Sequence, residues 1–292
     1  MRIKEKLSDR IWLVFVHVFI ALVVLLMTLP FINILALSFS GETAVIQGRV
    51  TFWPIDFTLK TYERVFTESQ ILLALKNTIW LTLVGTIINV VFTVLAAYPL
   101  AKQKLKGRNA FLALITFTMI FYAGIIPHYI NIKNLKLLDT FWSLWLSGAL
   151  STYNMIILKT FFQSIPESLE ESAQIDGASF IRILIQIVLP LSKAALATIA
   201  LFYAVGWWNS YFNNMLYINK AELTTLQIRL KELLSLTNSN LFQNVDASEQ
   251  NKIVEESVKA VSIVIATVPI LIVYPFLQKY FVKGVMIGSI KG

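Results

Sequence analysis

A polar segment between two apolar runs carries the residues whose types and spacing could do chemistry. It reads Glu171-Ser-Ala-Gln-Ile-Asp-Gly177, and Ile187-Val-Leu-Pro190 follows nine residues later. Glu170 and Glu171 are adjacent carboxylates, but neighbours in a helix point in different directions, whereas an acid–base pair must converge on one substrate. The segment therefore predicts a solvated carboxylate surface for a protein partner rather than a catalytic centre.

A second cluster, Trp207-Trp-Asn-Ser-Tyr-Phe-Asn-Asn214, combines aromatic rings with amides and hydroxyls inside an apolar run. Aromatic faces can stack on sugar rings and amides can bind sugar hydroxyls, and polar groups within a span usually face a cavity or another helix. An aromatic belt with helix–helix contacts near the outer interface is the alternative, and it stays open. On helical spacing two faces are expected, one with Trp207, Tyr211 and Asn214 and the other with Asn209 and Asn213. The candidate substrate-path residues are Trp207, Trp208, Asn209, Tyr211, Asn213 and Asn214.

Motifs for metal or nucleotide chemistry are absent from the sequence. It has no cysteine, and neither His17 nor His128 has a partner at metal-ligand spacing, so both are expected to be interfacial or packing residues. Without a G-x-x-x-x-G-K-[ST] phosphate loop the chain cannot be an ATPase itself. Asn77 and Asn89 are weaker substrate-path candidates. We therefore expect a non-catalytic chain that binds no metal or cofactor.

The composition predicts a membrane protein. Of 292 residues, 57% are hydrophobic and 14% are charged, and the mean hydropathy is +0.68. A soluble domain of this composition would aggregate, so the bilayer is the expected solvent. The net charge of +8 comes from basic residues beside apolar runs, which indicates topology signals and lipid contact rather than nucleic-acid binding.

Six apolar runs are each long enough to cross a bilayer with some tilt. We predict an all-α integral membrane protein with a single domain over 1–292. A signal peptide is the alternative for the first run, but this run exceeds a usual hydrophobic region of about 7–15 residues. The predicted spans are 11–37, 71–101, 110–130, 141–162, 191–218 and 258–281.

The positions of Lys and Arg predict the orientation, because cytoplasmic flanks retain basic residues. With six spans, all three basic clusters fall on one side together with the Glu171 segment, so both termini are expected inside. The loops 38–70, 133–140 and 219–257 are then outside, and the last is expected to form a helix at 226–236. The clusters are Arg2, Lys4, Lys6 and Arg10; Lys102, Lys104, Lys106 and Arg108; and Lys279, Lys283 and Lys291.

Local signals predict a short surface helix around Glu171, over roughly 164–180. Ser164-Ile-Pro-Glu167 fits a capping box with proline in the first turn. Small side chains near Ala173 and Ala178 would let a neighbouring surface approach, and Gly177 can redirect the backbone without a Cβ penalty. Leu189-Pro190 is expected to mark the turn into the next span.

The spacing from Glu171 through Gly177 to Pro190 resembles the EAA motif of ABC importer permeases. Further segments are similar to carbohydrate permeases of the maltose-transporter type, especially the branch that imports oligosaccharides from plant or algal polysaccharides. Ser172, where alanine is usual, and Trp145-Leu-Ser147, where Ile-Leu-Pro is common, depart from the consensus. The similar segments are Gly124-Ile-Ile-Pro127, Asn134 to Thr140, Phe161 to Pro166 and Lys279 to Gly292.

The resemblance implies a type I importer fold in the bacterial cytoplasmic membrane. The helix around Glu171 would be the cytoplasmic coupling helix, and the tail would reach between two ATPase subunits that bind ATP and Mg. The implied partners are a second homologous permease, two ABC ATPase subunits and an extracellular substrate-binding lipoprotein. The implied docking residues are Leu169, Glu170, Glu171, Ala173, Ile175, Asp176, Gly177 and Ala178, and those of the tail are Lys283, Gly284, Gly288 and Lys291.

Three other functions remain open on the sequence. An ABC importer for another solute would share the EAA segment, although the closing segment favours sugar. A secondary transporter would usually carry ionisable residues in its spans, and acidic residues are almost absent from these. A membrane scaffold or sensor subunit would recruit a soluble partner without a sugar or a second permease.

Overall fold

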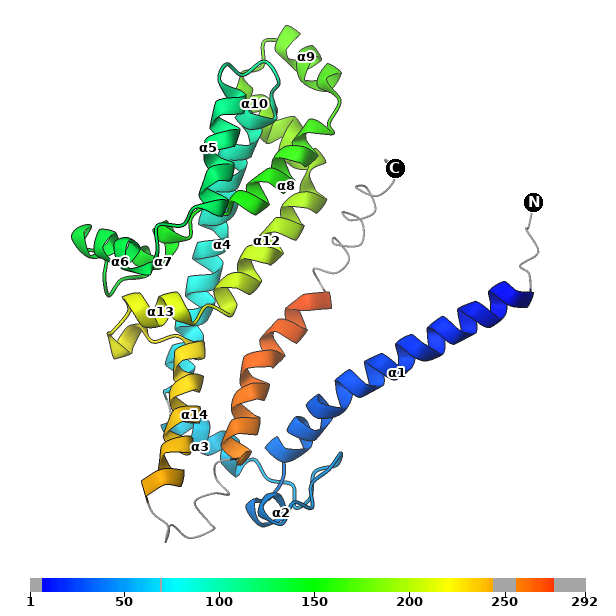
Figure 1. The fold of residues 1–292 in the computed structure, drawn as a ribbon, viewed down its shortest axis with the longest axis vertical. Helices are drawn as coiled ribbons and strands as arrows, with labels where there is room; N and C mark the ends of the chain where they lie inside the picture. Colours follow the sequence, from blue (N-terminus) through cyan, green and yellow to red (C-terminus); the bar gives the residue numbers. More distant parts are fainter. Residues whose placement is uncertain (1–6, 69, 244–255, 276–292) are drawn as a thin grey trace. The chain divides into compact units, whose positions relative to one another are not determined.

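The computed structural model describes residues 7–68, 70–243 and 256–275, and every regular element in these ranges is helical (Figure 1). This confirms the predicted all-α fold class. The predicted single domain falls into two compact units. One contains 1–70 with 230–268, and the other contains 71–229 with 269–292.

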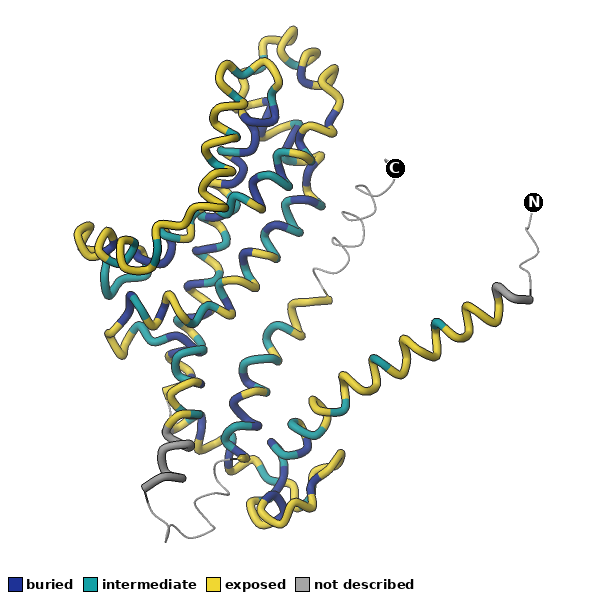
Figure 2. Tube along the Cα trace, viewed as in Figure 1, coloured by how far each residue is buried: buried dark blue, intermediate teal, exposed yellow. Residues whose placement is uncertain are grey.

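The second unit is built on α4 (Ile71–Ala101), which packs along α8 (Thr152–Gln163) and α12 (Lys193–Trp208). Leu81, Gly85, Asn89 and Thr93 are all buried, and residues four apart lie on one face of a helix, so α4 has one continuous inward stripe. Figure 2 shows this burial as the dark stretches of the helices in this unit.

Two short helices replace the predicted span 110–130. α5 (Arg108–Ile120) and α6 (Ile125–Asn134) meet at 112°. α5 ends at the extended residue Phe121, and Gly124, whose φ of +92° favours glycine, is the N-cap of α6. Pro127 lies in the first turn of α6, where its missing N–H needs no partner.

The predicted span 141–162 is also interrupted. α7 (Phe141–Ser147) ends at Gly148, and Ser151 begins α8 by accepting a hydrogen bond from the Asn154 N–H at 3.4 Å. Some backbone N–H and C=O groups of residues 148–151 are not hydrogen-bonded within α7 or α8. Side chains of other helices therefore have to satisfy them.

The chain then forms α9 (Glu167–Ile175), α10 (Phe180–Ile183), a π-helix (Leu184–Val188) and α11 (Leu189–Leu191). The path bends by 84° at Ser192 before α12, so the turn lies two residues beyond the predicted Leu189-Pro190.

After α12, the predicted span 191–218 does not continue as one helix. α13 (Phe212–Tyr217) follows a break at 209–211, and then come a 3₁₀ turn (Ala221–Leu223) and α14 (Leu226–Gln243). The helix expected at 226–236 is confirmed and extends further.

The first unit contains α1 (Leu7–Ser38), α2 (Glu42–Ile46) and α3 (Lys60–Glu68). A small core joins the end of α1 to α2 through Ala36, Ala44, Val45 and Val50. Most of α1 exposes its apolar side chains, which is the expected surface of a lipid-facing helix (Figure 2).

Three helices in the described part of the chain are long and apolar enough to cross a membrane. They are Arg10–Ser38, Ile71–Ala101 and Glu256–Pro275, and the count rises to five if the bent pairs α5–α6 and α10–α12 each form one span. The predicted number of six is not confirmed by these helices. Residues 276–281 of the last predicted span lie outside the described residues.

Candidate functional site

The Glu171 segment forms α9, which begins at Glu167 rather than at the predicted Ser164. Pro166 is the N-cap, and Ser164 ends α8, where its hydroxyl donates to the Phe161 carbonyl at 2.7 Å. The predicted capping box is therefore wrong, because the Ser164 side chain is already used by the preceding helix. Glu167 and Glu170 still suit the positive N-terminal end of α9.

Gly177 ends the α9 segment as predicted. Its φ of +80° lies in the left-handed region, and its N–H donates to the Gln174 carbonyl at 3.0 Å. The Ala178 N–H donates to the Ala173 carbonyl at 2.9 Å, and Ser179 then caps α10. The chain is thereby redirected from α9 into α10 within four residues, 176–179.

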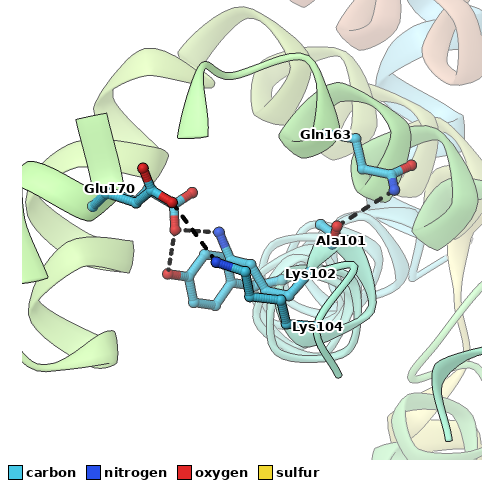
Figure 3. A network of polar contacts seen from close by, with 7 residues as sticks. Ala101, Lys102, Lys104, Gln163 and Glu170 are labelled. Carbon is cyan, nitrogen blue, oxygen red and sulfur yellow. Dashed lines mark hydrogen bonds and ion pairs between the residues drawn. The ribbon is translucent and has the colours of Figure 1, made fainter. Parts of the chain in front are cut away.

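Glu170 is buried, which corrects its expected place in a solvated loop and among the docking residues. Its side chain points back to the end of α4, where Oε2 accepts a hydrogen bond from the Tyr98 hydroxyl at 3.2 Å and forms an ion pair with Lys102 (Figure 3). The carboxylate is thus used inside the chain and is not available to a partner.

The outward residues of α9 include four of the predicted docking side chains. Glu171 is exposed and lies 3.7 Å from the Lys104 ammonium, and Ile175 is 86% exposed. Leu169 and Asp176 are exposed as well. Exposed charged and apolar side chains thus lie together on one short helix that is anchored through Glu170.

Ala173 and Ala178 lie elsewhere than expected. Both are half-buried and pack against the core formed by α4, α8 and α12. Their small size lets α9 approach the chain's own helices, so they do not form the predicted surface for a neighbour.

A groove of about 570 Å³ lies beside α9. Its lining combines charged groups with apolar surface, and Phe180 within it is 65% exposed. Lining residues from α4 and the turn after it, from α9 and from α10 include Tyr98, Lys102, Glu170, Glu171, Phe180 and Ile181.

The substrate-path candidates do not converge on one face. The helix breaks at 209–211, so the spacing that grouped Trp207 with Tyr211 does not apply. Trp208 is buried, and Asn214 is buried with its amide donating to the Ser210 carbonyl at 2.9 Å and to Thr225 Oγ1 at 3.0 Å. Tyr211 is half-buried with its hydroxyl 3.1 Å from Met215 Sδ. Asn209 and Asn213 are exposed.

Trp207 is held as a packing residue between α4 and the end of α7. Its Nε1–H donates to Asn89 Oδ1 at 2.5 Å. A Cβ on Gly85 would lie 2.6 Å from the same nitrogen, and one on Gly148 would lie 3.0 Å from the ring. Only glycine leaves room for the indole there, so packing between helices is the better interpretation of Trp207.

Side chains of other helices form hydrogen bonds with the backbone at the break 148–151, and their importance was not evident from the sequence. The Asn89 amide donates to the Gly148 carbonyl, and the Ser151 N–H donates to the Tyr203 hydroxyl at 3.1 Å. That hydroxyl also lies 2.7 Å from Thr93 Oγ1. The polar residues on the buried stripe of α4 could have indicated these contacts in the sequence. Of these residues, only Asn89 was selected as a candidate.

The remaining polar candidates serve local contacts. Asn77 donates to the carbonyls of Glu222 and Thr224 at 2.8 and 3.0 Å, and His17 lies 2.7 Å from the Leu13 carbonyl on its own helix. The His128 ring lies beside Tyr122 and Tyr217. The tail residues Lys283, Gly284, Gly288 and Lys291 lie outside the described residues.

The chain is similar to several characterised proteins. Residues 94–287 match the family model of the binding-protein-dependent transport system inner membrane component. Protein LplC of Bacillus subtilis is 47% identical over 90% of this chain and 89% of its own length. The polygalacturonan/rhamnogalacturonan transport system permease protein YtcP of the same organism is 38% identical over 98% of this chain and 100% of its own.

A solved structure has the same fold. It comes from a bacterial ABC transporter involved in the import of the acidic polysaccharide alginate, with a TM-score of 0.85 and 35% sequence identity. The match covers 95% of this chain and 99% of that one. By the family match over 94–287 and by these relatives, the chain belongs to the inner membrane components of binding-protein-dependent, ABC-type transport systems.

Proposed function

We propose that the chain is one permease subunit of an ATP-driven importer for an oligosaccharide derived from a polysaccharide, and that α9 is its coupling helix. The observation that carries the proposal is the exposed side of α9, which presents Glu171 and Ile175 outward while Glu170 fixes the helix from within. A short helix that is anchored on one side and presents charged and apolar side chains on the other suits docking in a partner's cleft.

In this proposal Glu171 forms the charged contact to an ATPase subunit, and Leu169, Ile175 and Asp176 pack around it. One α9 serves one ATPase, so two ATPase subunits require a second homologous permease. ATP and Mg²⁺ bind in the ATPases, whose closure pushes the two coupling helices together. Rigid-body rocking of the permeases then exposes the substrate path to a binding protein outside the membrane.

The substrate class rests on the relatives. YtcP is named for polygalacturonan and rhamnogalacturonan transport, and the solved neighbour belongs to an importer of an acidic polysaccharide. These names support an oligosaccharide over other solutes and make acidic oligosaccharides the first ones to test. An importer for a different solute is the alternative that the same experiment can identify.

The test is to purify the tagged chain from its native membranes in mild detergent and identify the proteins that remain bound. We expect a second permease and an ATPase, and ATP hydrolysis that rises when binding protein loaded with oligosaccharide is added. Acidic and neutral oligosaccharides are compared in parallel. Recovery of the chain without an ATPase, even after crosslinking, would reject the proposal.

A further inference from the structure

Glu170 is a buried charge in an exposed helix. It is 6% exposed, whereas Glu167 and Glu171 on the same helix are exposed. Burying a carboxylate costs free energy unless hydrogen bonds and an opposite charge compensate it. A docking surface does not require a buried carboxylate, so the role of Glu170 depends on the contacts that it makes inside the chain.

Both partners of Glu170 lie at the end of α4, Tyr98 in its last turn and Lys102 directly after it. The Tyr98 hydroxyl donates to Oε2 at 3.2 Å, and the Lys102 ammonium binds the same oxygen. The Lys102 nitrogen also lies 4.5 Å from the centre of the Tyr98 ring, where a cation is attracted to the aromatic face. The three side chains thus form one closed cluster (Figure 3).

This cluster lies at the boundary between α8 and α9, which we call the joint. Pro166 separates α8 from α9, and just before it the Gln163 amide donates to the Ala101 carbonyl at 3.4 Å. The end of α4 is therefore tied to the chain on both sides of the joint, once through α8 and once through Glu170. Without the second tie, nine-residue α9 could pivot between Pro166 and the turn at Gly177.

The neighbouring ion pair gives the contrast. Glu171 and Lys104 are 3.7 Å apart and both are largely exposed, so their attraction is screened and of little energetic value. In the pair of Glu170 with Lys102, the carboxylate side chain is 8% exposed and the lysine side chain 32% exposed, so this pair is better shielded from water. The two adjacent carboxylates therefore differ in task, one facing a partner and the other facing α4.

We propose that Glu170, Lys102 and Tyr98 act as a brace that transmits displacement of α9 to α4, and through its packing to α8 and α12. The inference rests on the proposed function, because it assumes that an ATPase moves α9. The three residues are positioning residues, since none of them needs to touch the ATPase or the sugar. Cutting the brace should leave the ATPase bound but lower the sugar transported per ATP hydrolysed.

The experiment uses the complete importer in proteoliposomes and compares Glu170→Gln, Lys102→Gln and Tyr98→Phe. For each variant, bound ATPase, basal ATP hydrolysis and oligosaccharide uptake per ATP are measured. We expect retained ATPase and about a tenfold lower uptake per ATP for the first two variants, with a smaller loss for Tyr98→Phe. Lys106→Gln is the matched control, because Lys106 is an exposed lysine of the same turn.

A charge exchange tests whether the attraction between the two side chains is what the coupling depends on. The double variant Glu170→Lys with Lys102→Glu should recover much of the uptake per ATP that each single replacement loses. Unchanged coupling in Glu170→Gln and Tyr98→Phe would overturn the brace, as would an assembled double variant that recovers nothing. Release of the ATPase by Glu170→Gln would assign the residue to docking instead. Absence of the ATPase from the unmodified complex would reject the proposed function itself.

Discussion

At the scale of single residues, the contact between Trp207 and Gly85 sets how closely α12 approaches α4. The indole occupies the space that a side chain at Gly85 would fill, and its nitrogen is held by Asn89. Small residues permit such close approach between helices in membranes, where packing replaces the hydrophobic effect as the driving force. The fit between these helices therefore depends on one missing methyl group.

Gly85→Ala is expected to destabilise the chain. The new Cβ would lie 2.6 Å from Trp207 Nε1, so the helices must shift at a cost of roughly 1–3 kcal/mol. Thermal unfolding in detergent measures the change. Gly206→Ala on α12 is the matched control, since nothing lies within 4 Å of the methyl group that this replacement would add. Equal melting temperatures for the two variants would contradict the described packing.

Asn89→Leu tests the polar contacts that hold the break after α7. The replacement removes the partner of the Gly148 carbonyl and of the Trp207 N–H, both of which lie in part-buried hydrogen bonds. A loss on the order of 1–3 kcal/mol is expected in thermal unfolding. Asn213→Leu, an exposed asparagine on α13, should change stability little. The reverse order of the two variants would show that Asn89 is not a structural contact.

Glu170 shows where sequence reasoning about single residues stops. Adjacent helical residues differ in direction by about 100°, so the sequence implied that Glu170 and Glu171 would not face the same way. Which of them faces inward depends on Tyr98 and Lys102, which are far away in the chain. The exposure of Glu171 and Ile175 was predicted correctly, whereas the inward packing of Ala173 followed from a tertiary contact that no local pattern encodes.

At the scale of elements, apolar runs located the helices but not their interruptions. The runs 71–101 and 11–37 became α4 and most of α1, and the helices continue through Pro99 and Pro30. The breaks at 148–151 and 209–211 were missed. At the first break, Asn89 and Tyr203 of other helices form hydrogen bonds with the backbone. Gly124 with Pro127 was visible as a signal, but it was used only as part of a family resemblance.

Among the residues at helix boundaries, Gly177, just after α9, is the one most suited to mutation. Gly177→Ala forces a side chain into the left-handed region at φ +80°, which costs roughly 1–2 kcal/mol, and should displace α9 from its partner surface. Reduced ATPase co-purification is the expected result, and combination with Glu171→Ala should deepen it. Ser172→Ala is the control, since its exposed hydroxyl donates only along α9, to the Ser168 carbonyl at 2.8 Å. An unchanged ATPase yield in the double variant would argue against docking at α9.

At the scale of the whole molecule, the bent pair α5–α6 decides the topology. If the pair crosses the membrane, the turn before α5 and the end of α6 lie on opposite sides. If it is re-entrant, they lie on the same side, and α7 to α9 reverse their orientation. The segments after α12 reverse as well, unless the second bent pair, α10–α12, is re-entrant too. The proposed cytoplasmic location of α9 requires that the basic turn 102–108 be inside as well, since Glu170 is bound to Lys102.

Labelling of single cysteines tests this topology directly, because the natural chain contains none. We expect Lys60→Cys and Lys133→Cys, both at exposed positions, to react with a membrane-impermeant maleimide in intact cells. Lys106→Cys and Asp176→Cys should react only after the membrane is opened, because the six predicted crossings would place them inside with both termini. The parent chain supplies the background. If Lys133→Cys reacts only after the membrane is opened, α5–α6 is re-entrant and one crossing is lost. If Lys106→Cys and Asp176→Cys both react from outside, α9 lies where no ATPase could bind it.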